Sequence, residues 1–291
     1  MEASLAYKTK QIIKKYEFNF KKNFGQNFLV DERVLDKIVN AANINENDLV
    51  IEVGPGIGTL TQAMAKKAGK VVSVEIDKTL VPILKELLSD YDNIEIINED
   101  ILKVDITEII ERHKGMNVKM AANLPYNITT PIIMGILEKH IPMESLTVMI
   151  QKEVAYRMNA KPSTKDYGSL SLVTQYYCEP YLVANVPQNC FMPRPNVDSA
   201  VIKLNILKEP VVKVKDERFL FDFIKAAFSQ RRKTLVNCIF SSGLVKADKE
   251  GIGKILNELG YDERVRGESL SLEDYGRLSD RFLEIRSGGE C

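Results

Sequence analysis

Short apolar runs alternate with amphipathic stretches along the first two thirds of the chain. Runs with the length and composition of buried β-strands occur at residues 48–53, 71–74, 94–97, 118–122 and 146–150. Between them apolar residues recur at helical spacing, as at 78–88 and at 31–39, where Asp31 is a suitable N-cap. Strands that alternate with helices in this way predict βαβ units and a mostly parallel sheet.

The pattern changes beyond residue 176. Two runs, 181–186 and 200–207, read as strands with no long helix between them, so the sheet is expected to end in an antiparallel pair. After them only helical patterns remain, at residues 219–228, 232–240, 249–259 and 272–285. Because Glu209-Pro210 breaks the last strand, we predict an α/β domain over 1–207 and a small all-helical domain over 208–291.

A glycine turn follows the first strand of the predicted sheet. Gly54-Pro55-Gly56-Ile57-Gly58 connects this strand to a helix that includes Leu60. Glycines there let the backbone approach a ligand with its N–H groups directed at it. The spacing G-x-G-x-G differs from the dinucleotide fingerprint G-x-G-x-x-G, which disfavours a nicotinamide cofactor. Taken alone, the turn is equally compatible with a plain strand-to-helix connection.

Acidic residues follow the next two strands. Glu75 directly follows the second strand, where a carboxylate can accept hydrogen bonds from both hydroxyls of a ribose, and it lies nearer the strand end than Asp77. Asp100 follows the third strand and could accept a hydrogen bond from an adenine amino group. Because the carboxyl ends of parallel strands share one sheet edge, we expect these side chains to line one ligand site. The alternative for Glu75 is a solvated carboxylate.

The tetrapeptide Asn123-Leu124-Pro125-Tyr126 follows the fourth strand and resembles the signature of methyltransferases that act on amino groups. The adenine amine is a poor nucleophile because its lone pair is delocalised into the ring. The side-chain oxygen of Asn123 and the carbonyl of Leu124 can accept hydrogen bonds from that amine and aim its lone pair at a methyl donor. Pro125 fixes the loop, and Tyr126 offers a ring on which the base can stack. The alternative is a strand end followed by a proline turn.

Together these motifs resemble the family of small-subunit ribosomal RNA adenine dimethyltransferases, over nearly the whole chain. Further stretches that carry the resemblance are Lys22-Asn23-Phe24-Gly25-Gln26-Asn27-Phe28-Leu29, Gln151-Lys152-Glu153-Val154, Tyr167-Gly168-Ser169-Leu170-Ser171, Gln175-Tyr176-Tyr177-Cys178, Phe191-Met192-Pro193-Arg194-Pro195-Asn196-Val197-Asp198-Ser199-Ala200, Gln230-Arg231-Arg232-Lys233-Thr234-Leu235 and Arg266-Gly267-Glu268-Ser269-Leu270-Ser271-Leu272. The resemblance implies a Rossmann-like, S-adenosylmethionine-dependent methyltransferase sheet. It also implies two methyl transfers to the N6 amine of each of two adjacent adenosines near the 3′ end of 16S rRNA, in ribosome biogenesis.

The resemblance assigns roles to individual residues. Asn27 and Leu29 are expected to contact the S-adenosylmethionine near its methionine end. Gly54 and Gly56 match the family's glycine turn, and Glu75 matches its carboxylate that binds the ribose. Asp100 matches the family's partner of the cofactor adenine, and Asn123 matches the residue that lies between cofactor and target amine. The expected partner is 16S rRNA within the small ribosomal subunit or its assembly precursor, bound by a monomer that uses no metal.

Two further stretches are candidates for RNA contact. Phe191 lies in a proline-rich loop, and we expect the target adenine to stack between Tyr126 and Phe191; the alternative is a core aromatic. Arg231-Arg232-Lys233 could meet phosphate, with a solvated helix face as an equally good alternative. The lysine-rich segment 1–30 is another candidate, and a solvated tail is its alternative.

Three other functions are disfavoured by particular residues or lengths. A related family methylates large-subunit rRNA and confers macrolide resistance, and its tetrapeptide is more often Asn-Ile-Pro-Tyr; Leu124 and Pro131 favour the small-subunit enzyme. A mainly non-catalytic assembly or transcription factor on the same fold is disfavoured by the intact Asn123 and Tyr126. A DNA adenine methyltransferase is disfavoured because residues 208–291 leave little room for a target-recognition domain.

Net charge and cysteine usage bear on the partner and the compartment of the protein. The 40 basic and 40 acidic residues cancel, which counts against a general nucleic-acid binder. The charges are unevenly distributed, however: residues 1–30 carry six bases and two acids, a net charge of +4. Residues 31–207 carry 18 bases and 23 acids (−5), and residues 208–291 carry 16 bases and 15 acids (+1). A neutral total is therefore compatible with an enzyme that recognises an assembled ribosomal particle. Scattered cysteines without a C-x-x-C pair, a polar start and no long apolar stretch predict a cytoplasmic protein without a zinc site or membrane contact.

Overall fold

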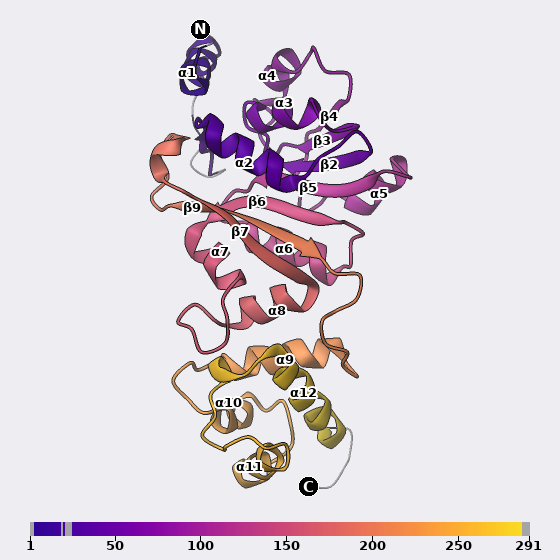
Figure 1. Cartoon of the computed structure of the whole chain (residues 1–291), viewed down its shortest axis with the longest axis vertical. Helices are drawn as coiled ribbons and strands as arrows, with labels where there is room; N and C mark the ends of the chain where they lie inside the picture. The colour runs from indigo at the N-terminus through magenta and orange to yellow at the C-terminus, as the bar shows by residue number, and fades with distance from the viewer. Residues whose placement is uncertain (1–2, 19, 21–24, 287–291) are drawn as a thin grey trace. The chain divides into compact units, whose positions relative to one another are not determined.

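The computed structural model of the chain describes residues 3–18, 20 and 25–286. Its helices are α1 (Leu5–Lys15), α2 (Glu32–Ala42), α3 (Thr59–Ala65), α4 (Val81–Leu87), α5 (Ile106–Arg112), α6 (Thr129–Glu138), α7 (Lys152–Met158), α8 (Ser169–Tyr177), α9 (Glu217–Ala227), α10 (Leu235–Ser242), α11 (Lys249–Glu258) and α12 (Leu272–Arg286). Its strands are β1 (Phe28–Leu29), β2 (Asp48–Val53), β3 (Lys70–Val74), β4 (Ile94–Ile97), β5 (Asn117–Asn123), β6 (Ser145–Gln151), β7 (Cys178–Val186), β8 (Phe191–Met192) and β9 (Ser199–Ile206). Figure 1 shows the elements with these labels.

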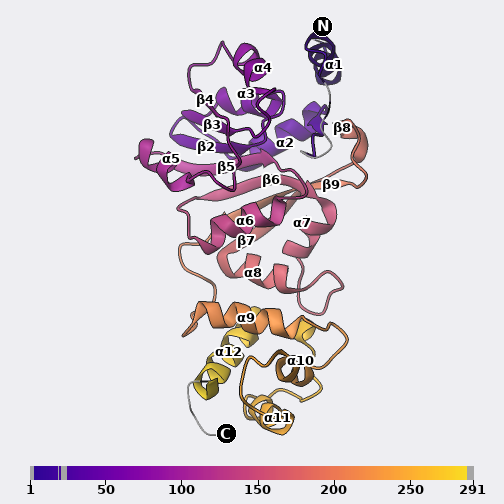
Figure 2. The same ribbon diagram turned by 180° about the vertical axis from the view of Figure 1, so that it is seen from behind.

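Seven strands form one mixed sheet in the order β4-β3-β2-β5-β6-β9-β7. The strands from β4 to β6 are parallel, and β9 runs antiparallel to β6, with Met149 opposite Val201. The short strands β1 and β8 form a separate antiparallel pair. The prediction of an α/β fold, with a mostly parallel sheet that ends in antiparallel strands, is confirmed. Helices cover both faces: α2 lies in front of the sheet in Figure 1, and α6 lies in front of it in Figure 2.

The strand order reverses beside β2. The chain runs outward from β2 through β3 to β4 and then returns to β5 on the other side of β2. The reversal leaves a crevice at the carboxyl ends of β2 and β5, which is where ligands bind in open α/β sheets. The sheet interior is apolar, since Leu49, Val50 and Ile51 of β2 have no exposed surface. Burial on both faces accounts for the nearly continuous apolar run in the sequence of this strand.

The chain divides into two compact units. The first comprises residues 1–155 and 180–206, and the second residues 156–179 and 207–291. Residues 156–179 thus group with the C-terminal helices, although the sequence pattern placed them in the first domain. Aromatic packing explains this, because the rings of Tyr176 and Tyr177 lie 5.2 and 5.7 Å from that of Phe221. The functional division into a catalytic and an RNA-contacting domain stays a prediction.

Residues 5–15 form a helix that the sequence pattern did not predict. Ser4 caps α1 by accepting a hydrogen bond from the backbone of Tyr7. Ile12 and Ile13 pack against a hydrophobic cluster of the first unit, so this part of the basic segment is folded and is not a solvated tail. Within the described ranges, no helix is long and apolar enough to cross a membrane.

Candidate functional site

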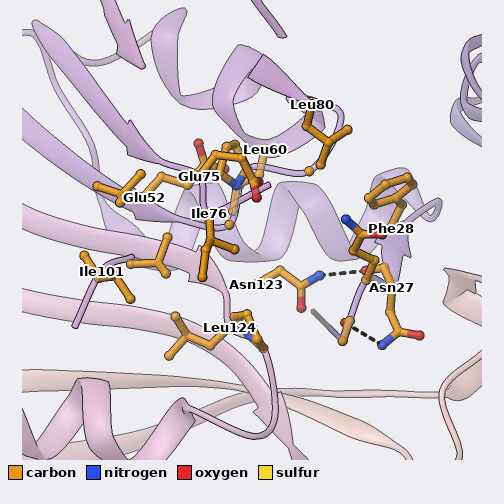
Figure 3. A pocket seen from close by; sticks show the side chains of 18 of the residues that line it. Asn27, Phe28, Glu52, Leu60, Glu75, Ile76, Leu80, Ile101, Asn123 and Leu124 are labelled. Carbon is orange, nitrogen blue, oxygen red and sulfur yellow. Dashed lines mark hydrogen bonds between the residues drawn. The ribbon is translucent and has the colours of Figure 1, made fainter. Parts of the chain in front are cut away.

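A pocket lies at the carboxyl ends of β2, β3, β4 and β5, at the point where the strand order reverses. Residues from the segment Gly25–Leu29, which includes β1, also line it. The predicted residues in its wall are Asn27, Leu29, Gly54, Gly56, Glu75, Asp100, Asn123, Leu124 and Tyr126. The structure therefore brings nine predicted residues to one site, and it does so from five separate stretches of sequence. Figure 3 shows this pocket from close by.

The glycine turn has a backbone that favours glycine. The φ angles of Gly54, Gly56 and Gly58 are +66°, +61° and +80°, which side chains rarely adopt. At Gly56 space is also limiting, because a Cβ atom there would lie 2.9 Å from the ring of Phe28. The turn thus keeps the pocket floor free of side chains. The backbone can then lie directly against a ligand.

Glu75 is a buried carboxylate in the pocket wall, with only 4% of its surface exposed. Its burial raises the pKa of the carboxyl to about 7, although backbone hydrogen bonds from Asp77, Gly56 and Ile76 oppose this shift. The Oε1 atom accepts the bond from the Asp77 N–H at 2.8 Å. These bonds fix the side chain but leave it at the pocket surface. Glu75 is therefore suited to accept hydrogen bonds from a ligand.

Glu52 is a second buried acid in this wall, and it was not among the predicted site residues. Its Oε2 atom accepts hydrogen bonds from the hydroxyls of Thr61 (2.6 Å) and Ser73 (2.7 Å). Burial raises its pKa to about 7 as well, and the charge of Glu75 adds to this shift. An acid inside the otherwise apolar run 49–53 was a signal that could have identified it.

Apolar side chains line the pocket next to the acids. Ile76 follows Glu75 and is 48% exposed, which is unusual for an isoleucine, and Ile101 follows Asp100. Both are labelled in Figure 3 on the same side of the pocket as Leu124. An apolar slot with a carboxylate at its edge can hold the flat ring of a nucleobase and accept a bond from its amino group. The sequence motifs identified the two acids but neither isoleucine.

Asn123 is held in one orientation at the end of β5. Its Nδ2 atom donates a hydrogen bond of 2.9 Å to the backbone carbonyl of Asn27, as Figure 3 shows. The Nδ2 atom of Asn27 in turn donates to the carbonyl of Gly25 at 2.9 Å. With its amide nitrogen engaged, Asn123 has its Oδ1 atom left to accept a hydrogen bond in the pocket. The segment before β1 thus sets the direction of this acceptor.

Tyr126 is fixed at both ends. Its hydroxyl and that of Ser199, the first residue of β9, form a hydrogen bond of 2.6 Å. At the backbone end, the carbonyl of Pro125 accepts hydrogen bonds from the hydroxyl of Thr129 (3.0 Å) and the N–H of Ile128 (3.2 Å). Burial raises the pKa of the Tyr126 phenol, so its hydroxyl stays protonated at neutral pH. The ring is an ordered wall of the pocket.

Phe191 lies elsewhere. Its side chain is 3% exposed and belongs to a hydrophobic core cluster with Leu29 and Val34, among others. It is paired with Leu29 across β1 and β8 and is not among the residues that line the pocket. The structure thus places this ring in the core, and stacking against a base would require β8 to move. The stacking role of Phe191 stays a prediction.

Arg231, Arg232 and Lys233 lie in the second unit, before α10, and all three are exposed. Arg231 is engaged within that unit, by an ion pair with Glu268 (3.2 Å) and a hydrogen bond to the carbonyl of Lys165. Lys22, Asn23 and Phe24 of the N-terminal motif lie outside the described residues. Across the described parts of the chain, no group of three or more histidine, cysteine or acidic residues could hold a metal ion.

The fold and the pocket define a Rossmann-like α/β protein with a ligand pocket at its topological switch point. Comparison with known proteins is more specific. The family model for ribosomal RNA adenine dimethylase matches residues 17–275. The "Ribosomal RNA small subunit methyltransferase A" of Lachnoclostridium phytofermentans is 56% identical over 274 residues, which is 94% of each chain. The chain belongs to the ribosomal RNA adenine dimethylase family.

Solved structures agree with this assignment. A dimethyladenosine transferase from Plasmodium falciparum superposes with a TM-score of 0.73 at 27% identity, over 86% of this chain and 95% of that one. The 23S rRNA methyltransferase ErmE superposes with a TM-score of 0.67, also at 27% identity, over 88% and 99%. Both are similar in fold over nearly their whole length.

Proposed function

We propose that this chain transfers methyl groups from S-adenosylmethionine to the N6 amines of two adjacent adenosines near the 3′ end of 16S rRNA, giving N6,N6-dimethyladenosine during ribosome biogenesis. One observation carries the chemical part of this proposal. Asn123 stands in the pocket wall with its nitrogen held by Asn27 and its oxygen available as an acceptor. The membership of the family and the names of relatives at 50–56% identity support the substrate.

The pocket fits S-adenosylmethionine. Glu75 would accept hydrogen bonds from the ribose hydroxyls, and Asp100 would accept one from the adenine amine, with the adenine ring between Ile76 and Ile101. The methionine end would lie near Asn27 and Leu29, over the bare backbone of the glycine turn. Buried carboxylates also suit a cofactor that carries a positive charge. When bound, this cofactor supplies an electrophilic methyl group on a sulfonium.

The chain's own residues would orient the target amine. The Oδ1 atom of Asn123 and the carbonyl of Leu124 accept its two hydrogen bonds, and Tyr126 stacks on the ring of an adenosine that is unpaired or flipped out. The backbone N–H of Leu124 donates to the carbonyl of Met149 at 3.0 Å, which ties the loop to β6. The methylated amine becomes acidic and loses a proton readily, so no strong base is needed. Catalysis then consists mainly of positioning.

The proposal favours the small subunit over the large one as the source of the RNA. Curated relatives at 50–56% identity carry the small-subunit name, whereas the 23S rRNA methyltransferase ErmE is 27% identical. We further propose that the enzyme acts as a cytoplasmic monomer on the subunit or its assembly precursor. In the second unit Arg232 and Lys233 are better candidates for phosphate contact than Arg231, which is paired with Glu268.

A substitution of Asn123 tests the proposed chemistry. Asn123→Ala should leave cofactor affinity largely unchanged and lower transfer of a labelled methyl group to unmethylated small subunits by roughly 100-fold or more. Asn117→Ala is a matched control, because Asn117 is exposed at the opposite end of the same strand, and it should retain full activity. If Asn123→Ala transferred methyl groups at the rate of the control, the proposed role of Asn123 would be wrong.

A further inference from the structure

We propose that the outer face of α1 is a contact surface for RNA, in which two lysines bind phosphates and a tyrosine stacks on an unpaired base. The surface consists of Tyr7, Lys10 and Lys14, which we call the α1 stripe. It rests on the proposed function, because it assigns the rRNA substrate a second contact beside the pocket.

The stripe follows from the helical period. Residues 7, 10 and 14 are spaced i, i+3 and i+7, so their side chains share one face of α1. The opposite face is turned inward: Thr9 is 1% exposed, and Ile12 and Ile13 pack against a hydrophobic cluster. Tyr7, in contrast, is 55% exposed, and both Lys10 and Lys14 are exposed. An exposed aromatic ring beside lysines offers a nucleic acid both a stacking surface and contacts for its phosphates.

The helix is anchored beside the pocket. The cluster under Ile12 and Ile13 contains Phe28, Ile57 and Leu80, and these three residues also line the pocket. α1 therefore packs against a hydrophobic cluster that also supplies part of the pocket wall. On this proposal, an RNA strand that delivers an adenosine to Asn123 also contacts α1.

Polar contacts fix the helix at its two ends. The backbone N–H of Leu5 donates to the Oε1 atom of Glu32 at 3.0 Å, and Lys15 forms an ion pair of 2.7 Å with Glu86. Lys15 is thus engaged in anchoring α1. Neither Lys10 nor Lys14 takes part in an ion pair among the described residues, so their charges remain available for phosphate.

Charge favours RNA as the partner. α1 contains four lysines and no acidic residue, while residues 31–155 and 180–206 of the first unit carry 15 bases and 21 acids, a net charge of −6. A polyanion would be repelled by the body of this unit, and lysines beside the pocket offset that repulsion. Tyr7 adds a contact suited to a nucleic acid, because an aromatic ring stacks on any unpaired base with little sequence preference.

The test compares two double variants of equal charge. Lys10→Ala/Lys14→Ala removes the cations of the stripe, and Lys66→Ala/Lys114→Ala removes two exposed lysines at the opposite edge of the sheet. Binding to unmethylated small subunits and to protein-free 16S rRNA is measured at several salt concentrations. We expect the stripe variant to bind both about tenfold more weakly and to lower the slope of log K against log salt by about 1.5. The control should keep the wild-type slope.

Three further measurements keep the outcomes distinct. Cofactor affinity and melting temperature should match the wild type in both double variants, and Tyr7→Ala should weaken binding several-fold while Tyr7→Phe restores it. An unchanged salt slope in the stripe variant, with an active wild type, overturns the proposal. A loss seen with subunits but not with protein-free RNA also overturns it and indicates a ribosomal protein as partner. An inactive wild type would instead refute the proposed function.

Discussion

Replacement of Glu75 by glutamine should make the fold more resistant to a rise in pH and should weaken cofactor binding. The folded protein holds the pKa of this carboxyl at about 7 because the group is buried. Unfolding returns the pKa to an ordinary value near 4.5. The folded state therefore binds the proton more tightly. Ionisation of Glu75 destabilises the fold as the pH rises from about 4.5 through 7, and the loss is complete above that range.

The size of this effect follows from the shift. A difference of about 2.5 pH units corresponds to roughly 3 kcal/mol, most of which develops between about pH 5 and pH 8. Glutamine has the shape of glutamate but no charge. Relative to wild type, Glu75→Gln should therefore gain about 2 kcal/mol in free energy of unfolding between these two pH values. Comparison of the two pH values cancels any fixed cost of the new amide against the N–H groups of Gly56, Ile76 and Asp77.

Urea unfolding of the cofactor-free protein at the two pH values measures this gain, and calorimetry at about pH 8 measures cofactor affinity. Loss of charge-assisted hydrogen bonds to the ribose should weaken that affinity roughly 10- to 100-fold. For wild type, affinity should fall as the pH drops below about 7, because the carboxyl becomes protonated. A stability difference that does not change with pH would show that Glu75 does not ionise as described, and a variant that binds the cofactor as well as wild type would show that its charge does not hold the ribose.

Three further substitutions test the positions of the pocket walls. Ser199→Ala and Tyr126→Phe each remove the same 2.6 Å hydrogen bond, so each should lower kcat about fivefold at unchanged cofactor KM. Because both variants lose the same bond, the double variant should be no slower than either single variant. Additive losses of rate in single-turnover kinetics would contradict this prediction. Gly56→Ala should lower the melting temperature and weaken cofactor binding at least tenfold. The alanine strains a φ of +61° and sets a methyl group 2.9 Å from the ring of Phe28. A cofactor affinity equal to that of wild type, measured by calorimetry, would count against a close approach of this backbone to the cofactor.

The order of apolar and polar residues is sufficient to predict the sheet and the ligand site at its edge. Each strand leaves a local signal in the sequence, and parallel strands bring their carboxyl ends to one edge. Glu75, Asp100 and Asn123 can therefore be placed together from the sequence alone. The hydrogen bonds of Glu52 are different, because they join it to Thr61 and Ser73, which lie 9 and 21 residues away. No local pattern predicts these contacts.

Other features depend on tertiary packing and leave weak local signals. α1 lies in a lysine-rich stretch whose few apolar residues acquire a role only through the cluster beneath Ile12 and Ile13. Phe191 was expected in a loop, but pairing between β1 and β8 buries it. Residues 156–179 join the second unit through rings at Tyr176 and Tyr177, contacts that no periodicity encodes.

Above all, we propose that this chain dimethylates two adjacent adenosines of small-subunit rRNA. Primer extension on 16S rRNA detects this product, because dimethyladenosine cannot pair normally and stops reverse transcriptase. Unmethylated small subunits incubated with the wild-type protein and S-adenosylmethionine should give two neighbouring stops near the 3′ end of the RNA, and Asn123→Ala should give none. Subunits that show no new stop with the wild-type protein would refute the proposed function, and equal stops with both proteins would refute the role of Asn123.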